Sequence, residues 1–502
     1  MQCRSLLLVT VKMDFGTLKK ITLGQRNAIK NKTILLVGET GAGKSTLINA
    51  LVNYALGVEF EENIWFEIVE DEKIRQTESQ TSDVIVYEIF GFEGIEHDLI
   101  VSQRLFDLFR SNDGVHAIDA VGLVMKASES RLSDRLRYIF DSVMSLFGKD
   151  LEENIVALIT HSNGRKPTNA LKALEAAEIK CAKNVKNEPV HFVFDNCQNE
   201  ERTEDIEDLK HSDRVTMKGL SEFTDFLEKA APQKLEKTVD VLNERITLTA
   251  CINNLQERIE FIKLKRQEIQ QTQEALKIYE QKVNKNKNFT IEVDEPYKES
   301  EPIESQMWWW VFYQGAVCCK VCEENCHYPG CTVAWYPDRC EVMKSGHCTV
   351  CTGKCPVSDH VKENWRFVTK TRKVEKTLND VKEKYNKNKV CEKTSSLLEN
   401  LQRELENLEA NKIQLLDEAY KHTMNLEKIA LNVYSLSTYV HLDFLIEEMM
   451  ERKENTEKIR NLKQIASQMN EGLQAGLKYM YSKVSDLFRF IRKVDAKRGT
   501  EV

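Results

Sequence analysis

Glycine and proline are scarce in this chain and unevenly placed. Its 502 residues include 20 glycines and 8 prolines, which is below the share of either residue in typical globular proteins. Neither residue occurs in 233–295 or in 357–471. Because tight turns depend on these two residues, an all-β protein, a collagenous chain and a string of small loop-rich modules are excluded. Both runs are instead expected to form long helices.

The chain also lacks an excess of one charge and any long apolar run. Charged residues of both signs make up 30% and leave a net charge of −8, so no nucleic-acid partner is expected. The apolar run at 6–11 is too short for a signal-peptide core or a membrane span. A cytoplasmic protein is therefore expected. The amphipathic pattern at 473–494 fits either a peripheral membrane contact or packing against protein.

The length predicts two or three structural units, since one domain usually holds about 150 residues. Strand-like runs at 33–37, 84–90, 120–125, 155–160 and 190–194 alternate with helical stretches such as 45–55 and 131–147. This alternation predicts an α/β domain with a mostly parallel sheet. The expected order is an extension at 1–29, the α/β domain at 30–230, a coiled-coil helix at 231–295, a Cys/His-rich module at 296–365, coiled-coil and C-terminal helices at 366–495 and a tail at 496–502.

Apolar residues recur at the 4-3 spacing of a coiled-coil seam in two places, 248–283 and 398–436. Two such helical arms on either side of the cysteine-rich module fit an antiparallel hairpin with the module at its tip. They fit a parallel homodimer equally well, and the spacing does not choose between the two.

A glycine-rich loop stands between the strand at 33–37 and an apolar helix. It has the pattern G-x-x-x-x-G-K-S, in which the glycines let backbone N–H groups converge on phosphates. The lysine of this pattern reaches the β- and γ-phosphate oxygens, and the serine offers its hydroxyl to Mg²⁺. Nucleotide binding is therefore predicted for Gly38, Glu39, Thr40, Gly41, Ala42, Gly43, Lys44, Ser45 and Thr46.

This loop, the segment Gly-Ile-Glu-His-Asp at 94–98 and the segment Glu-Asn-Ile-Val-Ala-Leu-Ile-Thr-His-Ser-Asn at 153–163 together resemble a known family. It is the septin-related, AIG1-type family of immune-associated nucleotide-binding GTPases, and in particular its larger members with coiled coils and a Cys/His-rich segment. The resemblance implies a P-loop GTPase-like domain that binds GTP or GDP with Mg²⁺. It also implies a homo-oligomer formed across the nucleotide face, to which the coiled coil would add.

The resemblance places further site residues. Thr160, His161 and Asn163 fall on the base-recognition motif, with His161 stacking on the base, and Cys197 follows in a loop that would present a backbone N–H to it. Most GTPases have an aspartate where Asn163 stands. An aspartate accepts from two guanine N–H groups whereas an asparagine has one acceptor and one donor group, so the choice of base stays open. Thr81, rather than Thr77, would close on Mg²⁺, unless both are surface hydroxyls.

The family's Asp-x-x-Gly switch is missing after the strand at 84–90, which runs directly into Gly91. Either the chain is a shortened isoform or gene model, or it binds nucleotide with impaired hydrolysis. Two other functions are weighed against a nucleotide-controlled assembly protein. One is a non-catalytic coiled-coil and zinc scaffold with a decayed nucleotide fold. The other is a hook-type chromosome ATPase, which is disfavoured because 433–502 lacks a strand ending in Asp-Glu and a glycine-rich signature loop.

Nine of the 14 cysteines lie between residues 318 and 355, and in a reducing compartment such a cluster usually holds metal. The alternatives are buried thiols and disulfides. The pairs Cys319/Cys322 and Cys348/Cys351 have the C-x-x-C spacing that would complete one tetrahedral Zn²⁺ site. A second site would draw on Cys326, His327, Cys331, Cys340, Cys355 and His360. Two structural zinc ions are expected, and a catalytic zinc is not.

Overall fold

The computed structural model divides the chain into two compact units. The first comprises residues 1–242, 427–439 and 461–502, and the second comprises 243–426 and 440–460. No helix in the described ranges is both long and apolar enough to cross a membrane. The structure describes residues 2–5, 10–14, 18–23, 32–55, 57–62, 64–67, 84–86, 109, 115–197, 206–281, 290–303, 315–331, 336–377, 380, 394–433, 436–451 and 456–467.

A four-stranded sheet in the order β10-β9-β8-β4 forms the centre of the first unit. Its strands are β4 (Ile34–Val37), β8 (Ala120–Lys126), β9 (Ile155–Thr160) and β10 (His191–Val193). Every neighbouring pair is parallel. All six residues of β9 are buried, as expected for a continuous apolar run in a parallel sheet covered on both faces.

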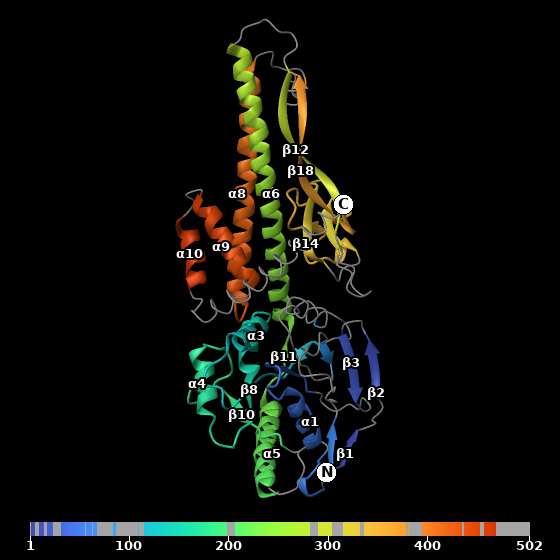
Figure 1. Ribbon diagram of the computed structural model, residues 1–502, viewed down its shortest axis with the longest axis vertical. Coiled ribbons are helices and arrows are strands. Elements are labelled where there is room, and N and C mark those ends of the chain that lie inside the picture. The colour runs from blue at the N-terminus through green and yellow to red at the C-terminus, as the bar shows by residue number, and fades with distance from the viewer. Residues whose placement is uncertain are drawn as a thin grey trace, which may run out of the picture. The chain divides into compact units, whose positions relative to one another are not determined.

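Helices surround this sheet (Figure 1). They are α1 (Lys44–Ala55), α3 (Asp134–Met144), α4 (Thr168–Ala176) and α5 (Ile206–Lys229), with short 3₁₀ turns η1 (Phe60–Glu62) and η3 (Lys149–Asn154). In the core Leu47 of α1, Phe192 of β10 and Phe223 of α5 belong to one buried cluster. The rings of Phe192 and Phe223 lie 5.2 Å apart. The predicted parallel sheet with helices is confirmed.

The strand predicted at 84–90 is placed differently. Only β6 (Val84–Val86) is described there, and it pairs in parallel with β3 (Leu18–Leu23), which also pairs with β2 (Thr10–Asp14). Among the described strands β4 pairs with β8 alone. A strand of three residues is too short for its apolar pattern to specify a pairing partner, so the sequence alone does not determine which sheet β6 joins.

Two further two-stranded pairings complete the first unit. The strand β1 (Gln2–Ser5) pairs in parallel with β5 (Ile64–Glu67). The strand β7 (Ala117–Ile118) pairs with β11 (Gln233–Lys234) in the antiparallel sense.

The second unit is built on two long helices, α6 (Glu236–Gln281) and α8 (Thr394–Ile429), which run side by side (Figure 1). Their ion pairs show the direction: Glu244 pairs with His422, and Arg266, further along α6, pairs with Glu409, which is earlier in α8. This is the antiparallel alternative within one chain. Part of the predicted seam is buried, including Ile252, Leu255, Ile269, Leu276 and Leu401, whereas Leu405 and Leu408 are half-buried. Helices α9 (Leu436–Glu451) and α10 (Thr456–Ser467) follow in the chain, and residues 440–460 of this stretch belong to the second unit.

A β-ribbon accompanies these helices, where helix was expected from residue 366 onward. The strands β12 (Thr290–Pro302) and β18 (Trp365–Thr377), each of 13 residues, pair antiparallel along their whole length. Ile291 and Val293 of β12 pack with Ile269 and Leu276 of α6 in one buried cluster. Alternating apolar and polar residues at the start of β12, and β-branched residues spread along β18, fit a half-buried strand.

The cysteine-rich module forms a small sheet in the order β14-β13-β17. Its main strands are β13 (Gly315–Cys319), β14 (Glu324–Cys331) and β17 (His360–Glu363), beside a hairpin of β15 (Met343–Lys344) and β16 (His347–Cys348). Two 3₁₀ turns, η4 (Pro337–Arg339) and η5 (Val357–Asp359), complete it.

The sequence had suggested that the module lies at the tip of a helical hairpin, and the structure places it elsewhere. It packs against α6 at Ala250 and Cys251, and Asn253 of α6 donates to the carbonyl of Tyr328. A 13-residue strand spans about 44 Å, and α6 rises about 42 Å between Asn253 and Gln281. The ribbon is therefore long enough to carry the chain back along α6 to the module.

Candidate functional site

The glycine-rich loop joins β4 to α1 at the carboxyl end of the sheet, which is where open parallel sheets bind ligands. Gly41 and Gly43 have φ angles of 76° and 91°, a left-handed conformation that favours glycine. A side chain at Gly38 would bring its Cβ within 2.3 Å of the Val124 carbonyl oxygen. The loop therefore needs glycine at all three positions, for two different reasons.

Lys44 is the first residue of α1. Its ammonium group donates to the carbonyl oxygens of Gly38, at 2.8 Å, and Glu39, at 3.0 Å. The side chain thus curls back over the loop, and the positive charge lies where the loop's backbone and the amino end of α1 also favour an anion. Ser45, the proposed Mg²⁺ ligand, is exposed in the first turn of α1.

Two contacts hold the loop from outside. The buried hydroxyl of Thr160, at the end of β9, donates to the Ala42 carbonyl at 2.7 Å. The hydroxyl of Ser133 donates to the Glu39 carboxylate at 2.5 Å and also caps α3 by accepting from Leu136 N–H. Ser133 was not identified from the sequence, although a serine before an apolar helical pattern is a recognisable N-cap signal.

Beyond β9, His161 adopts a left-handed conformation with φ of 51°. The side-chain oxygen of Asn163 accepts from the Arg165 N–H at 3.1 Å, so this oxygen takes part in a local turn. Both His161 and Asn163 are exposed. They lie at the same edge of the sheet as the glycine-rich loop, because β4 and β9 are parallel to the common neighbour β8.

The loop after β10 reaches the same edge. The backbone N–H of Cys197, expected to face a base, donates instead to the Asp195 carbonyl at 2.9 Å. Asp195 is held by Ser212, whose hydroxyl donates to its carboxylate at 2.8 Å. The side-chain nitrogen of Asn196 is buried without a hydrogen-bond partner among the described residues. Asn196 belongs to the loop that the sequence resemblance placed at the base, whereas no motif marks Asp195.

The threonines expected to close on Mg²⁺, Thr77 and Thr81, lie outside the described residues, and so does Gly91. One Asp-x-x-Gly sequence is present at Asp119–Gly122. Asp119, however, precedes β8 at the opposite end of the sheet, where its carboxylate accepts from Lys32 at 3.0 Å and from the Thr33 N–H at 2.8 Å. It is a structural residue and not a switch.

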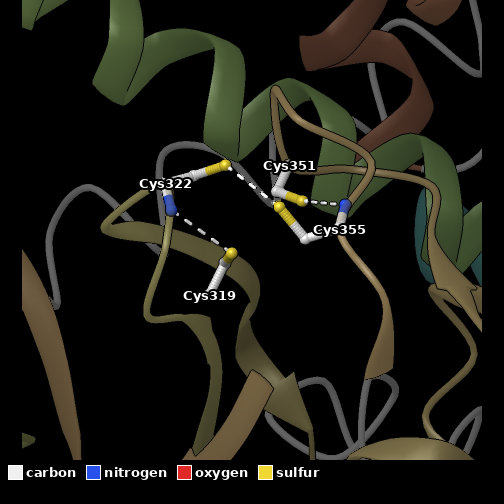
Figure 2. Close-up of side chains that lie close together, drawn as sticks. All are labelled: Cys319, Cys322, Cys351 and Cys355. Atoms are coloured by element: carbon white, nitrogen blue, oxygen red, sulfur yellow. Dashed lines mark hydrogen bonds between the residues drawn. The ribbon is translucent and has the colours of Figure 1, made fainter. Parts of the chain in front are cut away.

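In the second unit the module gathers its thiols into two groups of four ligand atoms. In each group the atoms lie within 4.8 Å of one another. Figure 2 shows the first group. It consists of Cys319, Cys322, Cys351 and Cys355, and the second consists of Cys326, Cys348, Cys351 and His360.

This grouping differs from the expectation that the two C-x-x-C pairs complete one site. Cys348 lies in the second group, and Cys355 takes its place in the first. The sulfurs of Cys322 and Cys355 are 3.6 Å apart, close to the edge of about 3.8 Å that Zn–S bonds of about 2.3 Å give in a tetrahedron. Both cysteines are free rather than disulfide-bonded.

His327 and Cys340 lie apart from both groups. His327 Nδ1 is 3.2 Å from the Cys340 sulfur and 3.6 Å from Glu341 Oε2. The three residues form a buried cluster, of which Glu341 was not identified from the sequence. Three ligands are one fewer than a closed structural zinc site has. Cys331 lies in β14 opposite Gly315, and its side chain is outside the description.

His360 has the geometry of a metal ligand. It is 5% exposed, and its Nδ1 lies 2.9 Å from the Pro356 carbonyl oxygen. A carbonyl only accepts, so Nδ1 carries a proton, and the neutral ring would offer the lone pair of Nε2 to a metal ion. Nε2 is buried with no hydrogen-bond partner among the described atoms. Such an arrangement, with one ring nitrogen held by a carbonyl, is typical of metal-bound histidines.

Backbone N–H groups point at the sulfurs. The backbone nitrogen of Cys322 lies 3.4 Å from the Cys319 sulfur, and the backbone nitrogen of Gly353 lies 3.4 Å from the Cys322 sulfur. Burial, opposed by these N–H groups, raises the pKa of Cys322 to about 12 and that of Cys319 further. Cys319 and Cys322 are therefore protonated without a cation, and a metal ion would have to displace their protons. Sulfur-rich donors with one imidazole fit Zn²⁺.

Comparisons with known proteins add little to this geometry. No protein-family model matches the sequence, and no curated protein matches it. Similar solved structures include three of Toc33 from Arabidopsis thaliana. The dimerization-deficient mutant has 14% identity and a TM-score of 0.27, and the match covers 40% of this chain and 87% of that chain. The complex with GDP and Mg²⁺ has 13% identity, coverage of 41% and 89% and a TM-score of 0.28, and the complex with Mg²⁺ and GMPPNP has 14% identity, coverage of 40% and 87% and a TM-score of 0.26. Likeness at this level carries no argument about ligands.

Proposed function

We propose that this chain is a guanine-nucleotide-binding protein that holds the phosphates of GTP or GDP in the loop of residues 38–46. The carrying observation is the position of Lys44, whose ammonium group lies over the loop carbonyls at the amino end of α1. Phosphate oxygens would replace these carbonyls as its partners. Ser45 would then hold Mg²⁺ with its hydroxyl.

The choice of base rests on the edge formed by β9 and β10. Guanine presents an acceptor at its 6-position, where adenine presents a donor. The buried side-chain nitrogen of Asn196 and the side-chain nitrogen of Asn163 are both donors, so they favour an acceptor. His161 would stack on the ring. The Asn163 oxygen is engaged by Arg165, which predicts weaker guanine selectivity than an aspartate would give.

The cysteine-rich module, in this proposal, is held by two structural zinc ions. In each of its two groups the four ligand atoms lie within 4.8 Å of one another, and they supply the thiolate and imidazole donors that zinc prefers. We place the zinc function in stability, since each group already offers four ligands and leaves no position for substrate.

Nucleotide state would control assembly of the chain into homo-oligomers, through the nucleotide-binding face, the paired helices α6 and α8, or both. Hydrolysis would be slow, because the segment 84–90 runs directly into Gly91 without an Asp-x-x-Gly switch. The competing function is a scaffold that uses no nucleotide at all. Turnover of GTP above a Lys44→Ala control would exclude this scaffold.

Thermal unfolding tests the binding proposal. At a ligand concentration of 100 times Kd, binding adds about 2.7 kcal/mol to the free energy of unfolding, which raises Tm by several degrees. GTP and GDP with Mg²⁺ should each raise Tm of the wild-type chain. Lys44→Ala should abolish most of the shift, because about 1.5–3 kcal/mol comes from a hydrogen bond to a charged group. Equal shifts with ATP would contradict the guanine assignment, and no shift with any nucleotide would contradict binding.

A further inference from the structure

The sulfur of Cys351 belongs to both groups of the cysteine-rich module. We infer that the two zinc ions share the Cys351 thiolate as a bridging ligand and form one binuclear cluster. This inference rests on the proposal that the module binds zinc. In the cluster one ion has the terminal ligands Cys319, Cys322 and Cys355, and the other has Cys326, Cys348 and His360.

Among the described residues, the number of ligands favours the bridge. Two separate tetrahedral ions need eight ligand positions, and the two groups together contain seven residues. If Cys351 bound one ion only, the other would keep an open position, although its surroundings are buried. No further His, Cys, Asp or Glu joins either group among the residues that the structure describes. A shared sulfur completes both tetrahedra with the ligands that are present.

Charge gives a second argument. A buried site with four thiolates beside a site with three thiolates and one imidazole would require seven thiolates, whereas the shared arrangement has six. The cluster therefore carries one negative charge fewer. Burying an uncompensated charge is unfavourable, and the module is buried at Cys319, Cys326, Cys348 and Cys351.

The local backbone fits a bridging position for Cys351. The sulfur of Cys351 accepts from the Cys355 N–H at 3.3 Å. The N–H of Cys351 in turn donates to the sulfur of Cys348 at 3.4 Å. The short segment 348–355 thus supplies Cys348 to the second group and Cys355 to the first group, with Cys351 between them in both. Gly353 allows this approach, because its Cβ would meet the Cys355 sulfur at 2.9 Å and the Cys322 sulfur at 3.3 Å.

Cadmium NMR on the full-length chain tests the bridge without any mutation. Cadmium-113 replaces zinc in thiolate sites and is itself an NMR nucleus. Two resonances are expected, one with four sulfur ligands and one with three sulfurs and a nitrogen. Each should be split by the other through the shared sulfur when both sites hold the isotope. Two bound ions with unsplit resonances would overturn the bridge and leave the zinc proposal intact, whereas binding of no metal would overturn both.

Variants give an independent stoichiometry. Cys351→Ala should lose both ions, because each loses a ligand. Cys355→Ala and Cys348→Ala should each retain one of the two ions. Cys318→Ala is the matched control, since Cys318 is equally buried but its sulfur faces Asn325 Oδ1 at 3.4 Å, and this variant should retain both. Retention of one tightly bound ion by Cys351→Ala would overturn the bridge. If this variant does not fold, the cadmium coupling of the wild-type chain decides.

Discussion

The hydroxyl of Thr160 donates a hydrogen bond of 2.7 Å to the carbonyl oxygen of Ala42, 118 residues earlier in the chain. It fixes the glycine-rich loop to the end of β9, the strand that leads directly into His161 and Asn163. The phosphate end and the base end of the proposed nucleotide site therefore meet at one side chain. Because Thr160 is 1% exposed, water cannot replace this bond.

Thr160→Val should weaken nucleotide binding by roughly five-fold, since a net hydrogen bond is worth about 1 kcal/mol and the loop loses its anchor. The two side chains have nearly the same shape, so packing is preserved. Titration calorimetry with GDP and Mg²⁺ measures the change. Thr238→Val is the matched control: Thr238 is also buried and accepts from the Gly148 N–H at 3.3 Å, away from the loop. An equal loss of affinity in both variants would contradict the role assigned to Thr160.

Gly353→Ala should weaken zinc binding by about ten-fold or more, the usual effect of disturbing groups that support metal ligands. The added methyl would lie 2.9 Å from the Cys355 sulfur and push it out of position. Competition with a zinc chelator measures the affinity. Lys320→Ala, an exposed change in the same module, should have no effect. Unchanged zinc affinity in Gly353→Ala would argue against the first group as a metal site.

A buried ion-pair network joins the β-ribbon to α6. Lys376 of β18 pairs with Glu268 of α6 at 2.9 Å and with Glu295 of β12 at 2.8 Å. Lys376→Ala should lower the free energy of unfolding by about 2 kcal/mol, because it removes one of the cations that face the buried Glu268 carboxylate. Urea denaturation measures this change.

The same strand offers a matched control for that variant. Lys373 pairs with Glu292 at 2.8 Å, but its side chain is 76% exposed. Lys373→Ala should change the free energy of unfolding by less than about 0.5 kcal/mol. If the two variants were equally stable, the ribbon would not be held to α6 in the way described.

Acid should destabilise the second unit through His441. Burial lowers the pKa of His441 from its ordinary 6.5 to about 4. Below pH 6.5 the unfolded chain binds a proton that the folded chain does not, so stability falls as the pH drops from 6.5 toward 4. The expected loss is about 3 kcal/mol. His441→Leu should remove this part of the pH dependence, and the comparison of the two chains cancels the acid release of metal. Parallel stability curves would contradict the assignment.

Sequence patterns predicted the elements whose structure depends mainly on residues that are adjacent in the sequence. The strand, loop and helix around Lys44 follow from one stretch of sequence, and so do the apolar strands β8 and β9. The ribbon was missed because Gly and Pro scarcity was taken to mean helix. β18 contains no glycine or proline and is still a strand, since pairing with β12 over 13 residues outweighs composition.

The cysteine grouping could not be read from spacing alone. The spacing of Cys348 and Cys351 matches that of Cys319 and Cys322, which favoured pairing the two motifs in one site. Cys348 instead belongs to the second group only, whereas Cys351 belongs to both groups. Which sulfurs come together depends on how β13, β14 and β17 pair in the folded module. The same holds for Ser133, which reaches the glycine-rich loop only through the folded sheet.

Direct calorimetric titration of GDP with Mg²⁺ into the full-length chain tests the central claim. The account predicts saturable binding of one GDP per chain, weakened at least ten-fold in Lys44→Ala, whose loop carbonyls lose their cation. ATP should bind more weakly than GDP to the wild-type chain. The account would be contradicted by the absence of heat from guanine nucleotides, or by identical binding isotherms for the wild-type and Lys44→Ala chains.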